Sequence, residues 1–456
     1  MKKTVAIGLS VFFVLVLAYV GGSYYLGGQA LKSYNQAIAQ INGSKDLKAS
    51  TVSCQRGLFR SRALTRITLV LPRKTPPISF ELVDTIYQGP FVFLHGPHFK
   101  GGLRPVLAVI RTRPAPGADL KNVLEEVPEL ASSEMLTVLS IDGSAASYLD
   151  IPSFQHKFPD DKGGQMEVEY GGLTGQFHFD ARLAKAVCFF NFPSLLVTQQ
   201  GHRLEIESVR GRFASHPGIK GISVGSTAVS IGAVESVENG HSLFTLASFG
   251  LKAQSRVVED KINGSIRLDF AKLNAGGLGL GPFSMEFEAR KLDAGVLAGF
   301  QRLAPVLQRE ELANDEAAKD EIRGLLAKMA ADLLARRPEF EIKQLDLRTD
   351  KGDLTGKARL GFDNDGEDVS RNILALLMSM DASAEFSVSQ ALFYFVAQNV
   401  LSQNSGPDSD QAKAAARRLV ARLLASKYMI AEAGAFKSNA ALKHGILTVN
   451  GRRLGF

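Results

Sequence analysis

Two stretches of alternating side chains decide the fold: Ser265-Ile266-Arg267-Leu268-Asp269-Phe270 and Phe283-Ser284-Met285-Glu286-Phe287-Glu288-Ala289. Every second residue in them is apolar, and the residues between are polar or charged. This period of two is typical of a β-strand that buries one face and exposes the other. The two stretches therefore predict antiparallel strands that are joined in hairpins and meanders.

The same alternation recurs from about Leu47 to Asp293 in short runs, such as 63–70, 166–170, 176–180 and 203–209. Gly, Pro, Asn or Asp separates the runs, which gives the 43 glycines among 456 residues a local cause as turn residues. A chain that is 45% hydrophobic and 22% charged is neither disordered nor a polytopic membrane protein.

Helical patterns begin after Asp293, which is a suitable N-cap for a helix over Ala294 to Gln308. Further helices are expected at 311–336, 389–401 and 411–426, with strands at 340–348, 354–362 and 446–449. The predicted fold class is α+β, an extended antiparallel β-sheet with helices packed on it mainly in the C-terminal third. The expected segments are 1–31, a cytoplasmic tip and anchor; 32–293, a β-rich region; and 294–456, a mixed region continuous with the same sheet.

The N-terminal segment predicts a single transmembrane helix. After Lys2 and Lys3 no charge appears until Lys32, and the apolar centre from Val5 to Leu26 reaches about 33 Å as a helix. The two lysines favour a cytoplasmic N-terminus, while Tyr24 and Tyr25 suit the far membrane interface. The bulk of the chain is then expected outside the cytoplasm; a cleaved signal peptide is the alternative.

The two cysteines, Cys54 and Cys188, fit a non-cytosolic space either as one disulfide or as two isolated thiols. The formal net charge of +7 is mildly basic, and the densest basic cluster falls on one predicted helix and consists of Arg417, Arg418, Arg422 and Lys427. Stacking aromatics and nucleic-acid motifs do not accompany it, so no nucleic-acid partner is expected. A solvated helix face or a contact with anionic lipid head groups explains the cluster.

No cofactor, metal or catalytic residue is expected. The run from Gly221 to Gly225 matches the G-x-S-x-G pattern around Ser223, but a β-type run follows where a nucleophile elbow needs a helix. His95 and His98 have no further ligand at suitable spacing, and the acidic run from Asp363 to Asp368 has Asn372 where a calcium loop needs Glu.

Several short motifs carry a family resemblance. They are Gly21 to Tyr25, Cys54 to Ser61, His95-Gly96-Pro97, Leu280-Gly281-Pro282 to Leu292-Asp293, and Gly445 to Gly451. Together they resemble the YdgA-like family of bacterial proteins of unknown function over nearly the whole chain. The resemblance implies a protein that is anchored in the inner membrane and folded in the periplasm, and it supplies no catalytic residue.

These observations lead to an expected function without catalysis: a single-pass inner-membrane protein that acts in cell-envelope structure or interaction. The alternative is binding or transfer of a lipid through an apolar groove of the sheet, and a hydrolase is the remote one. Arg56 is expected either to cap carbonyl groups, with Gly57 in a turn and Phe59 packed into the sheet, or to contact a head group or partner. The predicted helices 311–336 and 411–426 each need a cover, which tertiary packing or a homodimer provides.

Overall fold

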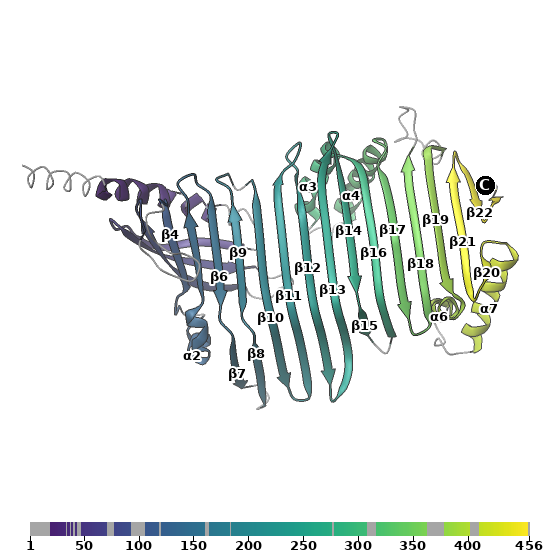
Figure 1. The fold of residues 1–456 in the computed structure, drawn as a ribbon, viewed down its shortest axis with the longest axis horizontal. Coiled ribbons are helices and arrows are strands. Elements are labelled where there is room, and N and C mark those ends of the chain that lie inside the picture. Colours follow the sequence, from purple (N-terminus) through teal and green to yellow (C-terminus); the bar gives the residue numbers. More distant parts are fainter. Residues whose placement is uncertain are drawn as a thin grey trace, which may run out of the picture. The chain divides into compact units, whose positions relative to one another are not determined.

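The computed structural model describes residues 19–32, 34–36, 38–39, 42, 47–70, 77–92, 105–117, 120–159, 164–182, 184–275, 278–307, 316–362, 378–401 and 410–454. The chain divides into two compact units, unit 1 at Met1–Ala214 and unit 2 at Ser215–Phe456 (Figure 1). The division falls within β11 (His202–Pro217). β16 (Leu278–Asp293) pairs with both β14 (Lys261–Phe270) and β17 (Glu339–Thr349), so the sheet continues across residue 293.

Unit 1 is an antiparallel meander in which successive strands pair with each other. Its first strands are β1 (Leu47–Gln55), β2 (Arg60–Leu69), β3 (Ile78–Gln88), β4 (Ala108–Pro114), β5 (Glu134–Leu139) and β6 (Ala145–Ile151). Helix α2 (Lys121–Glu126) and the short 3-10 helix η1 (Pro128–Ser132) connect β4 to β5.

The remaining strands of unit 1 share an aligned interruption. β6 and β7 (Phe154–Pro159) are separated at Pro152, and β8 (Gln165–Tyr170) and β9 (Leu173–Phe179) at Gly172. Gly172 has a φ of +90°, and a Cβ there would lie 3.0 Å from the Ile151 carbonyl oxygen, so the position needs glycine. β10 (Ala186–Gln199) passes the interruption unbroken and pairs with β9 and then β8.

A helix covers one face of the unit 1 sheet. Residues 19–32, 34–36 and 38–39 are helical, and the buried residues Ser23, Gly27, Ala30 and Tyr34 recur every three or four positions. Small side chains let the helix backbone approach the strands closely, and a Cβ at Gly27 would overlap the buried Gln88 side chain. Ala30 and Tyr34 complete a core with Ala63, Ile86, Leu107, Ala108 and Ile110. The C-terminal part of the predicted anchor therefore packs on protein.

The buried carboxylate of Asp84 joins this helix to three strands. Its oxygens accept hydrogen bonds from the hydroxyls of Tyr34 at 2.7 Å, Thr65 at 2.6 Å and Thr112 at 2.5 Å. All four side chains are buried. Burial first, then the charge and hydrogen bond of Asp84, raises the pKa of the Tyr34 hydroxyl above its usual range. A buried charge is tolerated because hydroxyl donors replace water on both oxygens.

Unit 2 is a second antiparallel meander. Its strands are β12 (Ser223–Glu238), β13 (His241–Val258), β14 (Lys261–Phe270), β15 (Lys272–Ala275), β16, β17 (Glu339–Thr349), β18 (Gly352–Phe362), β19 (Met380–Ser389), β20 (Ile430–Glu432), β21 (Ala435–Lys443), β22 (Ile446–Val449) and β23 (Arg452–Leu454). Strand pairing follows chain order with two exceptions. β14 pairs with β16, while the short β15 pairs with β13 and β16; and β19 pairs with β21 across the helices inserted between them. The predicted mostly antiparallel sheet with helices is confirmed.

Two helix pairs lie at opposite strand ends of unit 2 (Figure 1). After β16 come α3 (Ala294–Leu307) and α4 (Glu316–Leu334); after β19 come α6 (Gln390–Leu401) and α7 (Asp410–Ala425). Asp293 caps α3 as predicted, because its Oδ1 accepts the Gly295 amide at 2.8 Å. Ala294 packs with Ile222, Val224 and Ile262, whereas Leu392 and Val420 pack with Val388, Met429 and Phe436.

Among the described residues, which begin at Tyr19, no helix combines the length and the apolar character that are needed to cross a membrane. Lys2, Lys3 and the first part of the predicted spanning segment lie outside those residues. Tyr24 and Tyr25 lie within them, on the exposed side of the helix that covers the unit 1 sheet.

The Asp84 cluster gives a stability prediction. Asp84→Ala removes the acceptor of three buried hydroxyl groups. We therefore expect it to lower the free energy of unfolding of unit 1 by about 3 kcal/mol. Asp150 lies exposed on β6, so Asp150→Ala is a matched control with an expected change within about 0.5 kcal/mol. Urea denaturation of the purified chain measures both, and equal losses would contradict the structural role of Asp84.

Candidate functional site

One face of the unit 2 sheet is apolar over many strands. Cross-strand register places its side chains in rows, because residues opposite each other point to the same side. One row is Ile266, Phe287, Ile342, Ala358, Ala384 and Ala440; the next is Leu268, Met285, Leu345, Gly356, Phe386 and Ser438; the third is Phe270, Phe283, Leu347, Leu354, Val388 and Phe436. We call these three rows the apolar face.

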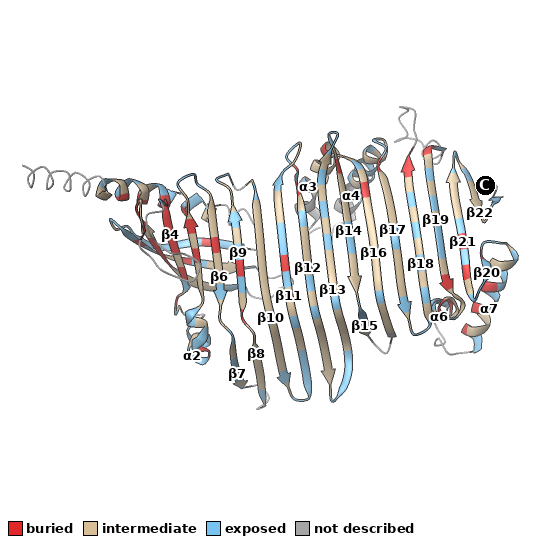
Figure 2. Cartoon of the chain, in the orientation of Figure 1, coloured by how far each residue is buried: buried red, intermediate tan, exposed pale blue. Residues whose placement is uncertain are grey.

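The helix pairs cover the ends of the apolar face and leave its middle accessible. Ile266 is 42% exposed and Phe386 is 39% exposed, and intermediate exposure prevails along β12 to β18 (Figure 2). The rings of Phe270 and Phe283 stack at 5.0 Å. Beside Phe386 the rows carry small residues, Gly356, Ala358, Ala384 and Ala440, which leave more room above the backbone than the flanking large side chains. The apolar face therefore has a shallow strip of small residues between larger side chains. We call the strip formed by Gly356, Ala358, Ala384 and Ala440 the low strip.

The opposite side of the same sheet is charged, and its charges are paired across strands. Lys343 bonds Glu288 at 2.8 Å, Arg290 bonds Glu341 at 2.8 Å, and Lys291 bonds Glu339 at 2.6 Å. The hydrogen bond from Lys291 lowers the pKa of Glu339, and the hydrogen bond to Glu288 raises the pKa of Lys343. We call this side the charged face; in these ladders each cation is neutralised by a carboxylate on the neighbouring strand.

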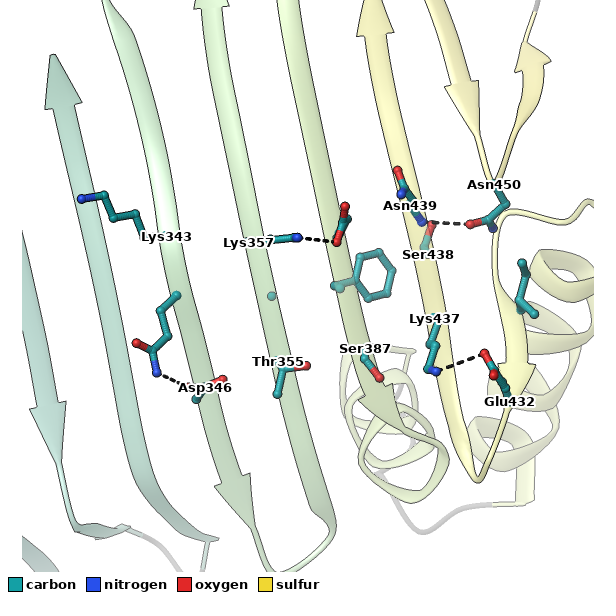
Figure 3. A pocket seen from close by; sticks show the side chains of 15 residues that line it. Lys343, Asp346, Thr355, Lys357, Ser387, Glu432, Lys437, Ser438, Asn439 and Asn450 are labelled. Carbon is teal, nitrogen blue, oxygen red and sulfur yellow. Dashed lines mark hydrogen bonds and ion pairs between the residues drawn. The ribbon is translucent and has the colours of Figure 1, made fainter.

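A shallow depression of about 510 Å³ lies on the charged face, across β17, β18, β19, β20 and β21 (Figure 3). Lys357 bonds Glu385 at 2.8 Å, and Lys437 bonds Glu432 at 3.0 Å (Figure 3). The amide of Gln344 donates to Asp346 on the same strand. Since the lysines that border the depression already hold carboxylates, it has the character of a solvated salt-bridge ladder.

The predicted basic cluster lies on α7, with its side chains directed to solvent. Arg417, Arg418 and Arg422 are exposed, and the buried residues Ala412, Ala416 and Val420 form the opposite side of the helix. Tertiary packing thus supplies the cover that this helix was expected to need. For α4, Met329 approaches Gly299 of α3, so part of its cover is also intramolecular.

Arg56 belongs to unit 1 and makes an intramolecular contact. Its Nη2 donates to the Tyr24 carbonyl at 2.9 Å, and its guanidinium lies 4.3 Å from the centre of the Tyr24 ring. The expected carbonyl cap is therefore observed, and Gly57 sits in a turn where a Cβ would overlap the Arg60 carbonyl oxygen. Phe59 was expected in the sheet; it is instead exposed and stacks on Tyr19 at 5.8 Å, because the helix provides the nearer apolar partner.

Both cysteines are free thiols. Cys54 is exposed on β1, and Cys188 is half-buried on β10. In the sheet Cys54 lies opposite Ala63 and Cys188 lies opposite Phe177, so the two cysteines are not cross-strand partners. The alternative with two isolated thiols is the one observed.

The G-x-S-x-G match around Ser223 continues into a strand. Ser223 begins β12, and the chain continues as a strand where a nucleophile elbow turns into a helix. Within the part of the chain that the structure describes, no group of three His, Cys, Asp or Glu side chains is placed to hold a metal. His95, His98 and residues 363–368 lie outside that part.

Two features escaped the sequence reasoning. The Asp84 cluster joins residues 34, 65, 84 and 112, and only the polar residues Thr65 and Asp84 in otherwise apolar alternation hinted at it. The alternating runs predicted that each strand has one apolar side. Whether those sides join into one continuous face depends on the pairing register between strands, which a period of two does not determine.

The fold and its surfaces define a class of protein: an α+β chain built on antiparallel meanders, with a sheet in unit 2 that is apolar on one face and charged on the other. The chain belongs to the family described as bacterial protein of unknown function (DUF945), whose model matches residues 1–455. This finding agrees with the resemblance that the motifs carry. No curated protein and no solved structure matches the chain.

The thiols give a reactivity prediction. Burial raises the pKa of the Cys188 thiol, so less of it is thiolate near neutral pH, and we expect a maleimide to label Cys54 faster than Cys188. The single-thiol variants Cys54→Ser and Cys188→Ser separate the two rates by mass spectrometry. Labelling of wild type that appears only after a reductant is added would instead show a bridged pair.

Proposed function

We propose that this protein is a non-enzymatic component of the bacterial cell envelope that binds acyl chains of lipids along the apolar face of unit 2. The single observation that carries the proposal is the registered apolar face, which stays partly exposed between the two helix pairs. Large exposed apolar patches are uncommon in soluble proteins and mark surfaces that bind something. No cofactor takes part in this role.

The shape of the apolar face suits an elongated apolar ligand. Acyl chains bind through area removed from water, at about 25 cal/mol per Å², and need no directional contacts. Phe386 and Ile342 border the low strip of small residues at Ala358 and Ala384 and can close over a chain that lies there. The rows offer few polar groups, which favours an acyl chain over a polar ligand.

A membrane tether belongs to the same proposal. The uncharged segment that begins at Thr4, behind Lys2 and Lys3, attaches the chain to the inner membrane through the residues before Tyr19, with the bulk in the periplasm, because residues 19–31 pack on the unit 1 sheet. Four exposed apolar or aromatic side chains surround the described start of the helix, and side chains of this kind suit a membrane interface. They are Tyr24, Tyr25, Leu58 and Phe59.

A structural or interaction role in the envelope is the second candidate, and the edge of unit 1 favours it. Among the described strands β1 pairs with β2 alone, and its outer residues are mostly exposed. An open strand edge can accept a strand from an envelope protein or from a second copy of this chain. Homodimerisation, which was expected from the predicted amphipathic helices 311–336 and 411–426, stays a prediction that sedimentation of the detergent-solubilised chain can test.

Site-specific photo-crosslinking tests the lipid proposal. A photoreactive phenylalanine analogue replaces Phe386 on the apolar face or its neighbour Glu385 on the charged face, and the full chain is irradiated in bacterial membranes. We expect lipid adducts from position 386, detected by mass spectrometry, and few from position 385, because adjacent strand residues point to opposite faces.

A matched pair of substitutions provides the control. Ala384→Phe fills the low strip and is expected to reduce lipid adducts at position 386 by about twofold or more. Ala441→Phe adds the same volume on the charged face and should leave them unchanged. Protein adducts in place of lipid at position 386 would overturn the lipid proposal and support the interaction role.

A further inference from the structure

The solvent side of helix α7 gathers several cations within two turns. Among the described residues, the side chains of Arg417, Arg418 and Arg422 form no ion pair. On the nearby strands, Lys357 and Lys437 each form an ion pair with a carboxylate. Asp410 is the single acid of α7, against four basic residues. The solvent side of α7 therefore carries uncompensated positive charge.

Helix α6 carries no charged residue, and its C-terminal half is unusually exposed for aliphatic side chains. Val400 is 62% exposed, Val396 is 49% exposed and Leu401 is 42% exposed. The buried residue Leu392 in the first half of α6 packs with Val420 of α7, so the two helices form one body. Solvation of three aliphatic side chains at one helix end is costly unless something covers them.

We infer that the α6–α7 pair is a docking surface for an anionic lipid bilayer, with Val396, Val400 and Leu401 inserted among the acyl chains and Arg417, Arg418 and Arg422 on the head groups. Positive charge and exposed aliphatic side chains on one helix pair are the combination by which peripheral proteins bind anionic membranes. Nucleic acid or an acidic protein would satisfy the arginines and leave the aliphatic residues uncovered.

The location adds a reason for docking. The helices pack on one end of the apolar face through Leu392, Val388 and Phe436. A docked pair would bring that end of the face to a bilayer surface. Docking goes beyond the proposed acyl-chain binding and does not require it, so each can fail without the other.

A depth-sensitive probe tests the inference in the full chain. Val400→Cys, in a background with Cys54→Ser and Cys188→Ser, carries an environment-sensitive fluorophore, and the protein is reconstituted into vesicles that contain a spin-labelled lipid quencher. We expect quenching in vesicles of phosphatidylglycerol with phosphatidylcholine and much less in phosphatidylcholine alone. A probe at Gln254→Cys, on the charged face, should be quenched in neither.

Charge variants separate specific docking from a general effect. Arg417→Gln, Arg418→Gln and Arg422→Gln together should weaken docking at position 400 by about 100-fold. The control Lys252→Gln, Arg256→Gln and Arg348→Gln removes the same charge from exposed strand positions and should leave quenching unchanged. Because every variant keeps the N-terminal segment, attachment through that segment cannot produce the difference.

Either of two results would overturn the inference: no quenching at position 400 in anionic vesicles, or equal losses in the two triple variants. If quenching at position 400 is lost while lipid adducts at position 386 persist, docking fails and acyl-chain binding stands. The reverse pattern leaves docking in place and removes the lipid-binding proposal.

Discussion

Cross-strand register is the constraint on which unit 2 depends, since a slip of one residue would move every apolar side chain to the charged face. The pairing of β17 with β18 contains a β-bulge, and the rows of the apolar face continue across it. Lys343 and Gln344 together oppose the single Lys357 on β18, so Ile342 and Leu345 both remain on the apolar face although three positions separate them. This bulge lets the rows continue from β14 to β21, while the salt-bridge ladders on the other side oppose a shifted pairing, which would bring like charges together.

In unit 1 the decisive interaction is the hydrogen-bonded carboxylate of Asp84. A helix that lies on a sheet through small residues gains little side-chain area from Ser23, Gly27 and Ala30, and the hydroxyl of Tyr34 supplies a directional attachment in addition. Asp84 also holds Thr65 of β2 and Thr112 of β4, so it fixes the helix to three strands at one point. Removal of water from such a cluster makes its geometry specific, because an unpaired member would cost free energy.

The proposed role is one of recognition, and it depends on two surfaces of unit 2. Around the depression on the charged face, Lys343, Lys357 and Lys437 are paired with carboxylates. The apolar face exposes hydrophobic area at Ile266 and Phe386, and the α6–α7 pair carries uncompensated charge at Arg418 and exposed aliphatic area at Val400. Both surfaces are of the kind that lipid can cover.

The sequence by itself determined the local structure: alternation in 265–270 and 283–289 predicted strands, Asp293 predicted a helix start, and the strand-like residues after Ser223 excluded a nucleophile elbow. These features follow from contacts within a few residues, which patterns record. Tertiary structure alone decided the order and register of the strands, the stacking of Phe59 on Tyr19, the packing of residues 19–31 on a sheet, and the grouping of Tyr34, Thr65, Asp84 and Thr112. Each of these depends on contacts between residues far apart in the chain, and alternation is equally compatible with many pairings of the same strands.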